Sequence, residues 1–257
     1  MILTLDVGNT QCFGGLFDTN GKLHLSFRKS STQSASSDEW GLFLREVLEA
    51  NGWESSKVDK IAIATVVPEV LHSLRGGCQK YFKLSPFELK AGTKTGLQIR
   101  YANPVEVGAD RIANCIAATK IFPNENTVIV DFGTATTFCA LSKTKEYFGG
   151  LIVPGIKLMM KALGDNTAKL PKVEILKTQK LIGRSTSECI QSGLYYGNLA
   201  MIQDICQRIS TEQFGGEKTK IVGTGGFAKL FREENVFDEI VPDLVLRGLY
   251  YAMEMNA

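Results

Sequence analysis

The sequence predicts an α/β protein made of two similar lobes, each built on a mixed β-sheet. A short acidic pattern occurs twice, as Asp6-Val7-Gly8-Asn9-Thr10 and as Asp131-Phe132-Gly133-Thr134-Ala135-Thr136-Thr137. Each copy directly follows an apolar run that is typical of a strand. The order of the predicted elements around each copy is also similar. We therefore predict two lobes, residues 1–120 and 121–257, with the boundary near residue 120.

The first half begins with three strands, predicted over residues 1–6, 11–17 and 22–29. The tetrapeptide Asp18-Thr19-Asn20-Gly21 is typical of a turn between the second and third strands. A polar stretch over residues 30–37 leads to an amphipathic helix that starts near Asp38 and ends near Gly52. Four more elements follow: a strand over 60–67, a helix from Pro68 towards Phe82, a strand over 87–89 and a helix over 105–122.

The second half repeats this order. Strands are predicted over residues 127–131, 135–141 and 146–153, and helices begin at Pro154 and near Thr186. A strand over 219–223 and helices around 227–233 and 243–255 complete this half. The repeated order of elements, together with the repeated acidic motif, favours a duplicated lobe.

The composition limits the classes of partner. With 257 residues and 44% hydrophobic content, the chain is long enough to bury a sizeable core. Its 29 basic and 27 acidic residues give a net charge of +2, which predicts no nucleic-acid partner and no anionic membrane. The sequence contains no signal-peptide pattern and no apolar run of about 18 residues, so we expect a cytoplasmic protein.

The cysteines and histidines do not indicate a disulfide framework or a zinc site. Widely spaced cysteines within apolar runs favour reduced thiols in the core. No pair has C-x-x-C spacing, and His24 and His72 lie far apart in the sequence. The six cysteines are Cys12, Cys78, Cys115, Cys139, Cys189 and Cys206.

The two acidic turns have the chemistry of phosphate-binding loops. In each, a carboxylate is followed by a glycine, which lets backbone N–H groups approach a ligand, and then by hydroxyl residues. Asp6 and Asp131 suit a hard cation such as Mg²⁺, because such cations take carboxylate and water oxygens. We therefore predict a nucleoside triphosphate between the two lobes.

Other nucleotide motifs are absent or weak. The P-loop pattern is missing, and Asp131-Phe132-Gly133 lacks the other motifs of protein kinases. Gly223-Thr224-Gly225-Gly226-Phe227-Ala228 fits the dinucleotide pattern G-x-G-x-x-A, but too little chain follows to complete that fold. This turn is either a wall against which adenosine lies or a purely structural strand-to-helix turn.

Asp110 is the candidate for the group that takes the proton from an attacking hydroxyl. It stands beside Arg111, whose guanidinium suits an anionic substrate or the transferred phosphoryl group. Adjacent residues on a helix do not face each other, so the two side chains would reach different parts of a site. The alternative is a solvated Asp/Arg pair on the surface of a capped helix.

These motifs resemble the type III pantothenate kinases, nearly end to end. That family belongs with hexokinase, actin and the heat-shock chaperone ATPases, whose actin-like ATPase fold has duplicated ribonuclease-H-like lobes, mixed β-sheets and a nucleotide cleft between them. Besides the two acidic turns, the matching segments are Gly15-Leu16-Phe17-Asp18, Thr65-Val66-Val67-Pro68, Lys94-Thr95-Gly96-Leu97, Tyr101-Ala102-Asn103-Pro104, Glu106-Val107-Gly108-Ala109-Asp110-Arg111-Ile112-Ala113-Asn114, Gly149-Gly150, Pro154-Gly155, Thr167-Ala168-Lys169-Leu170-Pro171, Gln191-Ser192-Gly193-Leu194-Tyr195-Tyr196-Gly197 and Thr224-Gly225-Gly226.

The resemblance implies ATP-dependent phosphorylation of the terminal hydroxyl of pantothenate to 4′-phosphopantothenate, the first step of coenzyme A biosynthesis. Asp110 would be the proton acceptor, Asp6 and Asp131 would bind metal, and Asp131 would hold the K⁺ or NH4⁺ that the family requires. A homodimer is implied, with a site that draws on both chains. The ATP site would comprise Asp6, Val7, Gly8, Asn9, Thr10, Gln11, Cys12, Phe13 and Thr134, and the pantothenate site Tyr101, Gly108, Ala109, Asp110, Arg111 and Thr186.

Three positions depart from the family pattern. Ser185 stands where asparagine is frequent, and Cys139 stands where an acidic residue is common. Cys12 lies inside the first phosphate loop, where it would alter packing or make the loop sensitive to alkylation. None of these changes removes a carboxylate that the mechanism needs.

Three other functions compete with this interpretation. One is a kinase on the same fold that acts on a sugar or on acetate. Another is a catalytically silent nucleotide-binding relative that regulates a partner as an accessory factor, although Asp6, Asp110, Arg111 and Asp131 are all present. A filament-forming ATPase is disfavoured because the chain is short.

Overall fold

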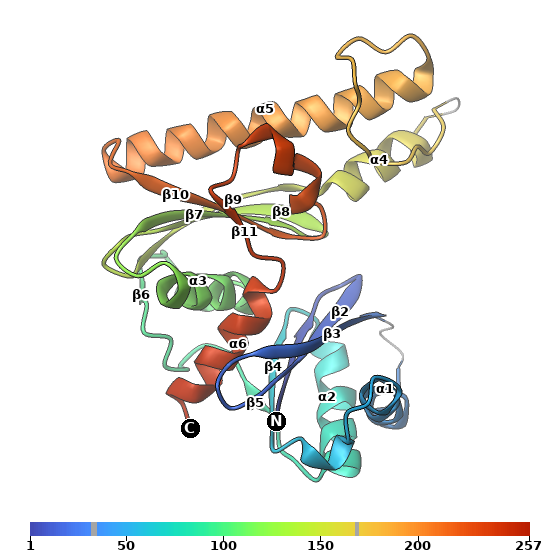
Figure 1. Cartoon of the computed structure of the whole chain (residues 1–257), viewed down its shortest axis with the longest axis vertical. Coiled ribbons are helices and arrows are strands. Elements are labelled where there is room, and N and C mark those ends of the chain that lie inside the picture. Colours follow the sequence, from blue (N-terminus) through green and yellow to red (C-terminus); the bar gives the residue numbers. More distant parts are fainter. Residues whose placement is uncertain (32–34, 168–169) are drawn as a thin grey trace. The chain divides into compact units, whose positions relative to one another are not determined.

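The computed structural model describes residues 1–31, 35–167 and 170–257, which form two compact units (Figure 1). Unit 1 comprises Met1–Leu97, Ala102–Lys120 and Leu244–Ala257, and unit 2 comprises Gln98–Tyr101 and Ile121–Asp243. The predicted lobes, 1–120 and 121–257, therefore need correction at two segments. Part of the polar stretch predicted over 30–37, and two residues of the motif at 167–171, lie outside the described residues.

Unit 1 is built on a five-stranded mixed sheet of order β3-β2-β1-β4-β5. The first strand pairs antiparallel with the second, and the second pairs antiparallel with the third, which confirms the three strands predicted at the start of the chain. The first strand also pairs parallel with the fourth. The strands are β1 (Ile2–Val7), β2 (Gln11–Phe17), β3 (Leu23–Ser30), β4 (Lys60–Thr65) and β5 (Phe87–Glu88).

One face of this sheet is buried under two helices, α1 (Ser37–Ala50) and α2 (Pro68–Gly77). Leu3, Leu5 and Val7 alternate along β1 and lie in one core with residues of both helices. This spacing of two is what a half-buried strand requires. Short helical turns, η1 (Ser55–Lys57) and the π-type η2 (Cys78–Phe82), complete this layer.

The C-terminal helix α6 (Leu244–Met255) packs on β1, β2 and β4 and therefore belongs to unit 1. A Cβ atom at Gly15 would lie 2.8 Å from Leu246, and one at Gly248 would overlap the Ala113 carbonyl of α3 (Ala109–Ile121). The Tyr250 hydroxyl donates to the Thr19 carbonyl at 3.0 Å. These close contacts are the physical reason why the predicted boundary fails for residues 244–257.

Unit 2 is built on a six-stranded sheet of order β11-β10-β7-β8-β9-β6. Residues 98–99 pair parallel with β9, so this short segment joins unit 2 although it precedes residue 120. The strands are β6 (Gln98–Ile99), β7 (Asn126–Phe132), β8 (Ala135–Leu141), β9 (Glu146–Pro154), β10 (Thr219–Gly225) and β11 (Glu239–Ile240).

The long helix α5 (Thr186–Phe214) lies along the unit 2 sheet, shown in orange in Figure 1. Its Leu194 and Ile202 share one core with Val128 and Val130 of β7. A shorter helix, α4 (Ile156–Asp165), follows β9 and contacts α5. Two further turns are 3-10 helices, η3 (Pro104–Glu106) in unit 1 and η4 (Ala228–Glu234) in unit 2.

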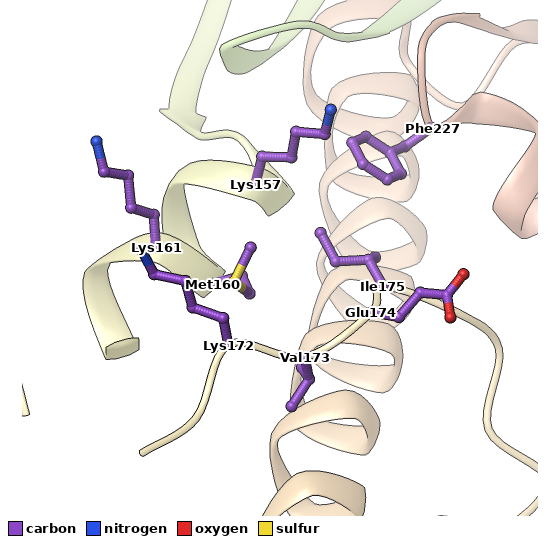
Figure 2. A pocket seen from close by; sticks show the side chains of 8 residues that line it. All are labelled: Lys157, Met160, Lys161, Lys172, Val173, Glu174, Ile175 and Phe227. Carbon is purple, nitrogen blue, oxygen red and sulfur yellow. The ribbon is translucent and has the colours of Figure 1, made fainter. Parts of the chain in front are cut away.

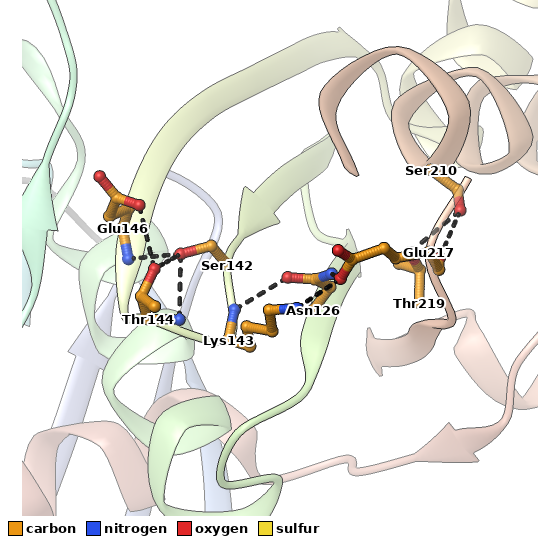
Figure 3. Close-up of polar contacts among 8 residues, drawn as sticks. All are labelled: Asn126, Ser142, Lys143, Thr144, Glu146, Ser210, Glu217 and Thr219. Carbon is orange, nitrogen blue, oxygen red and sulfur yellow. Dashed lines mark hydrogen bonds and ion pairs between the residues drawn. The ribbon is translucent and has the colours of Figure 1, made fainter. Parts of the chain in front are cut away.

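A polar network closes the end of the unit 2 sheet where β7 begins (Figure 3). Lys143 Nζ donates to Glu217 Oε2 at 2.6 Å, and Asn126 Nδ2 donates to the same oxygen at 3.1 Å. The Lys143 N–H in turn donates to Asn126 Oδ1 at 2.9 Å. Because β7 runs from Asn126 to Phe132, this network lies at the opposite end of the strand from Asp131.

All six cysteines are free thiols, and five of them are buried. This confirms the prediction of reduced core thiols, with Cys189 as the exposed exception. Among the described residues, no helix has both the length and the apolar character needed to span a membrane.

Candidate active site

The first acidic turn is a β-hairpin connection at one end of the unit 1 sheet. The Gly8 N–H donates to the Gln11 carbonyl at 3.0 Å, which closes the turn. Ser31 ties it to the end of β3, because its hydroxyl donates to the Gly8 carbonyl at 2.7 Å and its N–H donates to the Thr10 carbonyl at 2.9 Å. Asn9 is exposed at the tip, so a ligand can approach the backbone there.

The end of β4 is fastened beside this turn. The Thr65 hydroxyl donates to the Val7 carbonyl at 3.2 Å and accepts the Val67 N–H at 3.0 Å. The Val66 N–H also donates to the Val7 carbonyl, at 3.3 Å. These contacts give the Thr65-Val66-Val67-Pro68 motif a structural role, since they fix where the chain leaves β4 and enters α2.

Asp110 lies in the first turn of α3, which begins at Ala109 and not at residue 105 as predicted. The earlier residues form the separate turn η3, and the extended backbone at Val107 (φ −74°, ψ 124°) breaks the helix between them. A Cβ atom at Gly108 would overlap Asp110 Oδ1 and would lie 3.8 Å from Val66 Cγ1. The structure therefore brings Asp110 to the β4 side of the first acidic turn.

Arg111 is 5% exposed, so the interpretation of a solvated surface pair is wrong for this residue. Asp110 and Ala109 are half-buried. A buried guanidinium is costly unless it meets an anion or hydrogen-bond acceptors. The position of Arg111 is therefore consistent with a role inside a polar site.

The second acidic turn, in unit 2, is one residue shorter than the first. Phe132 pairs with Thr136, and the Gly133 N–H donates to the Ala135 carbonyl at 3.0 Å. Asp131 is half-buried at the end of β7, and Thr134 is exposed. The sequence repeat thus corresponds to a structural repeat, with a small difference in loop length.

Glycines from two other segments meet at this second turn. The Gly155 N–H donates to the Thr134 carbonyl and the Gly226 N–H donates to the Phe132 carbonyl, both at 3.0 Å. Gly225 has φ +83°, and a Cβ atom there would lie 2.5 Å from Asp131 Oδ1. The glycine-rich turn therefore belongs to the same site as the second acidic turn.

A cavity of about 480 Å³ opens in unit 2 beside this glycine-rich turn (Figure 2). The Phe227 ring follows the turn directly, and Lys157 Nζ of α4 lies 5.8 Å from its centroid. Apolar side chains and lysine stems share the wall with one carboxylate. Apart from the glycine-rich turn, no motif in the sequence indicated this pocket. The lining residues are Lys157, Met160, Lys161, Lys172, Val173, Glu174, Ile175 and Phe227.

Tyr101 belongs to unit 2, where its ring stacks on Tyr147 with centroids 6.3 Å apart. It also covers Gly149, which has φ +104°, and a Cβ atom there would lie 3.0 Å from the ring. A side chain at this position would both strain the backbone and crowd Tyr101. This accounts for the first glycine of the Gly149-Gly150 motif.

Thr186 is the first residue of α5 and is exposed. Ser185 caps the helix, since its hydroxyl accepts the Glu188 N–H at 3.3 Å, and Glu188 accepts the Arg184 N–H at 2.7 Å. Serine and asparagine are both good N-caps, so the departure at Ser185 preserves the start of this helix.

Cys12 is fully buried at the start of β2. Burial raises the pKa of its thiol, and the nearby Asp6 carboxylate raises that pKa further. Because the thiolate is the form that alkylating reagents attack, the structure contradicts the idea of an alkylation-sensitive loop. Cys12 is a packing residue.

Two mixed sheets, each ending in an acidic hairpin, have the fold of the actin-like ATPases and sugar kinases, which confirms the predicted α/β fold with duplicated lobes. Solved structures of this class superpose on the chain. A Campylobacter jejuni protein described as a candidate Baf family transcriptional activator gives a TM-score of 0.62 at 21% identity, over 99% of this chain and 98% of that chain. The activator of 2-hydroxyisocaproyl-CoA dehydratase from Clostridium difficile, with bound ADPNP, gives 0.50 at 13% identity, over 99% and 95%.

Sequence comparison identifies the family within this class. The sequence model of the type III pantothenate kinases matches residues 2–208. A type III pantothenate kinase of Legionella pneumophila (strain Corby) is 56% identical, and one of Elusimicrobium minutum (strain Pei191) is 47% identical. Both matches cover 100% of this chain and 99% of the relative. The chain belongs to the type III pantothenate kinase family.

Proposed function

We propose that this chain transfers the γ-phosphoryl group of ATP to the terminal hydroxyl of pantothenate, giving 4′-phosphopantothenate and ADP in the first step of coenzyme A biosynthesis. The observation that carries the proposal is the match to type III pantothenate kinases along the whole chain. It disfavours a sugar or acetate kinase. The presence of Asp6, Asp110, Arg111 and Asp131 speaks against a silent regulatory relative.

Asp110 is the residue that we assign as proton acceptor. The pantothenate hydroxyl oxygen attacks the γ-phosphorus, the bond from that phosphorus to the β,γ-bridging oxygen breaks, and the hydroxyl proton passes to the Asp110 carboxylate. Its half-buried position beside Gly108, on the β4 side of the first acidic turn, supports this role.

The donor set near the two acidic turns suits the cations that the family implies. Mg²⁺ binds through one or two carboxylates together with substrate phosphates and waters, and it would neutralise charge on the triphosphate. It therefore needs no large protein cluster, and the described residues contain no group of three or more metal-ligating side chains. We assign Mg²⁺ to Asp6 and Asp131. We also assign K⁺ or NH4⁺ to Asp131, together with main-chain atoms around it.

The nucleotide is assigned to the two acidic turns, the glycine-rich turn and the cavity. The backbone of residues 6–13 and Thr134 would hold the phosphates, and the adenosine would lie against Gly225 and Gly226. The aromatic Phe227 and the apolar wall of the cavity suit a base, and the lysines at its rim suit an anion.

Pantothenate is a small anion with amide and hydroxyl groups, so its pocket needs one cation and several polar donors. We assign Arg111 to its carboxylate and Tyr101 and Thr186 to its polar groups. Gly108 and Ala109 would line the pocket with main-chain atoms.

We also propose a cytoplasmic homodimer in which each site draws on both chains. Most of the large apolar side chains that are exposed in the structure belong to unit 2, on β9, on α4 and in residues 176–182. We place the contact between the two chains at these side chains, which association with a second chain would bury. They are Leu151, Ile152, Leu158, Leu163, Leu176, Leu181 and Ile182.

The test is a coupled assay of ADP release with pantothenate, with and without K⁺, on the wild type, Asp110→Asn and a matched control. The control is Asp204→Asn, which removes an exposed carboxylate that pairs with Arg208 on α5. Loss of the proton acceptor should lower kcat by about 10² to 10⁴, whereas the control should keep wild-type kcat.

Three results would contradict these assignments. An unchanged kcat in Asp110→Asn would remove Asp110 from the role of base. ADP release with a sugar or acetate, but not with pantothenate, would refute the proposed substrate. A folded wild type that binds ATP and releases no ADP would favour the silent regulatory relative.

A further inference from the structure

Arg28 stands in the same row of the unit 1 sheet as Asp6. The ladder pairs Asp6 with Phe13, and it pairs Phe13 with Arg28. Residues that pair directly across neighbouring strands project from the same face of a sheet. The side chains of Asp6, Phe13 and Arg28 therefore share one face, and with strands about 4.8 Å apart the Cα atoms of Asp6 and Arg28 are about 10 Å apart.

The Arg28 guanidinium is already held in position. Its Cζ atom lies 3.9 Å from the centroid of the Phe13 ring. Stacking of this kind orients the planar group and leaves its N–H donors in the plane available. Arg28 is exposed, and no carboxylate in the described part of the chain lies within ion-pair distance of it. This is a fixed cation whose donors can receive an anion from solution.

The strand order indicates which anion this is. Asp110 and Val66 lie on the β4 side of β1, whereas Phe13 and Arg28 lie on the β2 and β3 side. In phosphoryl transfer the attacking and leaving oxygens lie roughly in line, on opposite sides of the phosphorus. If the acceptor hydroxyl is at Asp110 and the γ-phosphoryl is at the first acidic turn, the β-phosphate extends towards β2 and β3.

We propose that Arg28 binds the β-phosphate of the phosphoryl donor and neutralises the charge that develops on the leaving oxygen. This role rests on the proposed kinase function. Residues 6–13 contain no lysine or arginine, so the first acidic turn has no cation of its own. A guanidinium can donate to two phosphate oxygens at once, and cations of this kind carry much of the catalysis in phosphoryl transfer.

The kinetic test compares Arg28→Gln with Lys29→Gln. Lys29 is a matched control because neighbouring strand residues point to opposite faces, and its Nζ lies 4.6 Å from the Phe43 ring on the α1 side. Arg28→Gln should lower kcat/KM for ATP by about 10- to 10³-fold, with the KM for pantothenate within about twofold of wild type. Lys29→Gln should keep both values within about twofold.

The binding test uses Mg-ATP, Mg-ADP and AMP in calorimetric titrations. Arg28→Gln should weaken the binding of ATP and of ADP by a similar factor of about ten. It should leave the affinity for AMP unchanged, because AMP lacks a β-phosphate. Arg28→Lys keeps the charge and should restore part of the affinity. Phe13→Leu removes the aromatic support and should give an intermediate loss.

The outcomes separate this proposal from the proposed function. Unchanged ADP affinity in Arg28→Gln, or a rise in the KM for pantothenate alone, would overturn the role of Arg28 and leave the kinase assignment intact. A wild type that does not phosphorylate pantothenate would overturn the kinase assignment, while the ATP, ADP and AMP titrations would still decide where Arg28 acts.

Discussion

Gly108 is the residue on which the position of the Asp110 carboxylate depends. A Cβ atom there would overlap Asp110 Oδ1 and would lie 3.8 Å from Val66 Cγ1. The carboxylate end of a side chain can rotate away, whereas a proton acceptor that moves by about 1 Å can lose about 10² in rate. The glycine therefore serves the geometry of the site more than the stability of the fold.

We expect Gly108→Ala to lower kcat by about 10- to 10²-fold while the Tm changes little. Steady-state kinetics and calorimetry on the same preparation test this. Gly197→Ala on α5 is a suitable control, since nothing lies within 4 Å of a Cβ atom at that position. A variant with wild-type kcat would show that Asp110 does not need this glycine.

The thiols should differ sharply in reactivity. Cys189 is exposed, whereas the other five cysteines are buried. Burial raises the pKa of the Cys78 and Cys206 thiols to about 12, so their thiolate fraction at neutral pH is minute. We expect iodoacetamide to label Cys189 alone in the native protein, and Cys189→Ser to abolish this labelling. Peptide mapping that finds native-state label on Cys12 would contradict the burial argument.

Motifs located the acidic site residues and the glycine-rich turn that contains Phe227, but they did not locate Arg28 or the cavity beside Phe227. Asp6 and Asp131 end apolar strands and precede glycine, a local pattern that is visible in the sequence. Arg28 lies in a strand without a motif, and its relation to Asp6 depends on the register of two ladders. Phe227 matters because it lines a cavity that residues 172–175 also line. Such relations need tertiary structure.

Among the elements, periodicity found the helices and strands better than it found their ends. The helix α3 was predicted, but its start was placed four residues early because Pro104 begins a separate 3-10 turn. The helix predicted from Pro68 to Phe82 is α2 followed by a π-type turn. The two-residue strands β6 and β11 were not predicted, and each is recognised only by its pairing with a neighbouring strand of unit 2.

The network at the far end of β7 should make stability depend on pH. Hydrogen bonding to Lys143 lowers the pKa of Glu217 below its ordinary value of 4.5. A lowered pKa means that the stabilisation is fully present above about 4.5 and is lost as the pH falls through the lower, folded-state value. Glu217 is exposed, so the effect should be small.

We therefore expect Glu217→Gln to lower the Tm slightly at pH 7 and to match the wild type once the pH falls well below 4.5. Calorimetric scans over this range test the prediction. Glu212→Gln, an exposed glutamate on α5 outside the network, should behave like the wild type throughout. A difference between Glu217→Gln and wild type that persists at low pH would point to packing and not to charge.

For the whole molecule, the duplication was predictable and the division of the chain was not. The two acidic hairpins and the repeated order of elements predicted two mixed sheets, and the structure confirms them. The assignment of residues 98–101 and 244–257 depends on which sheet they touch, and neither segment carries a local signal for that choice. Apolar residues along α6 predict a buried helix, but they do not indicate which of the two sheets it packs against.

The place of α6 also affects how the polypeptide matures during synthesis. Unit 1 starts at the first residue, yet one face of its sheet stays uncovered until residues 244–255 have emerged from the ribosome. Domains otherwise tend to fold in order from the N-terminus as they appear. Unit 1 can be completed only after the residues of unit 2 and α6 have been synthesised. A nascent or prematurely terminated chain therefore exposes apolar strands to chaperones and proteases.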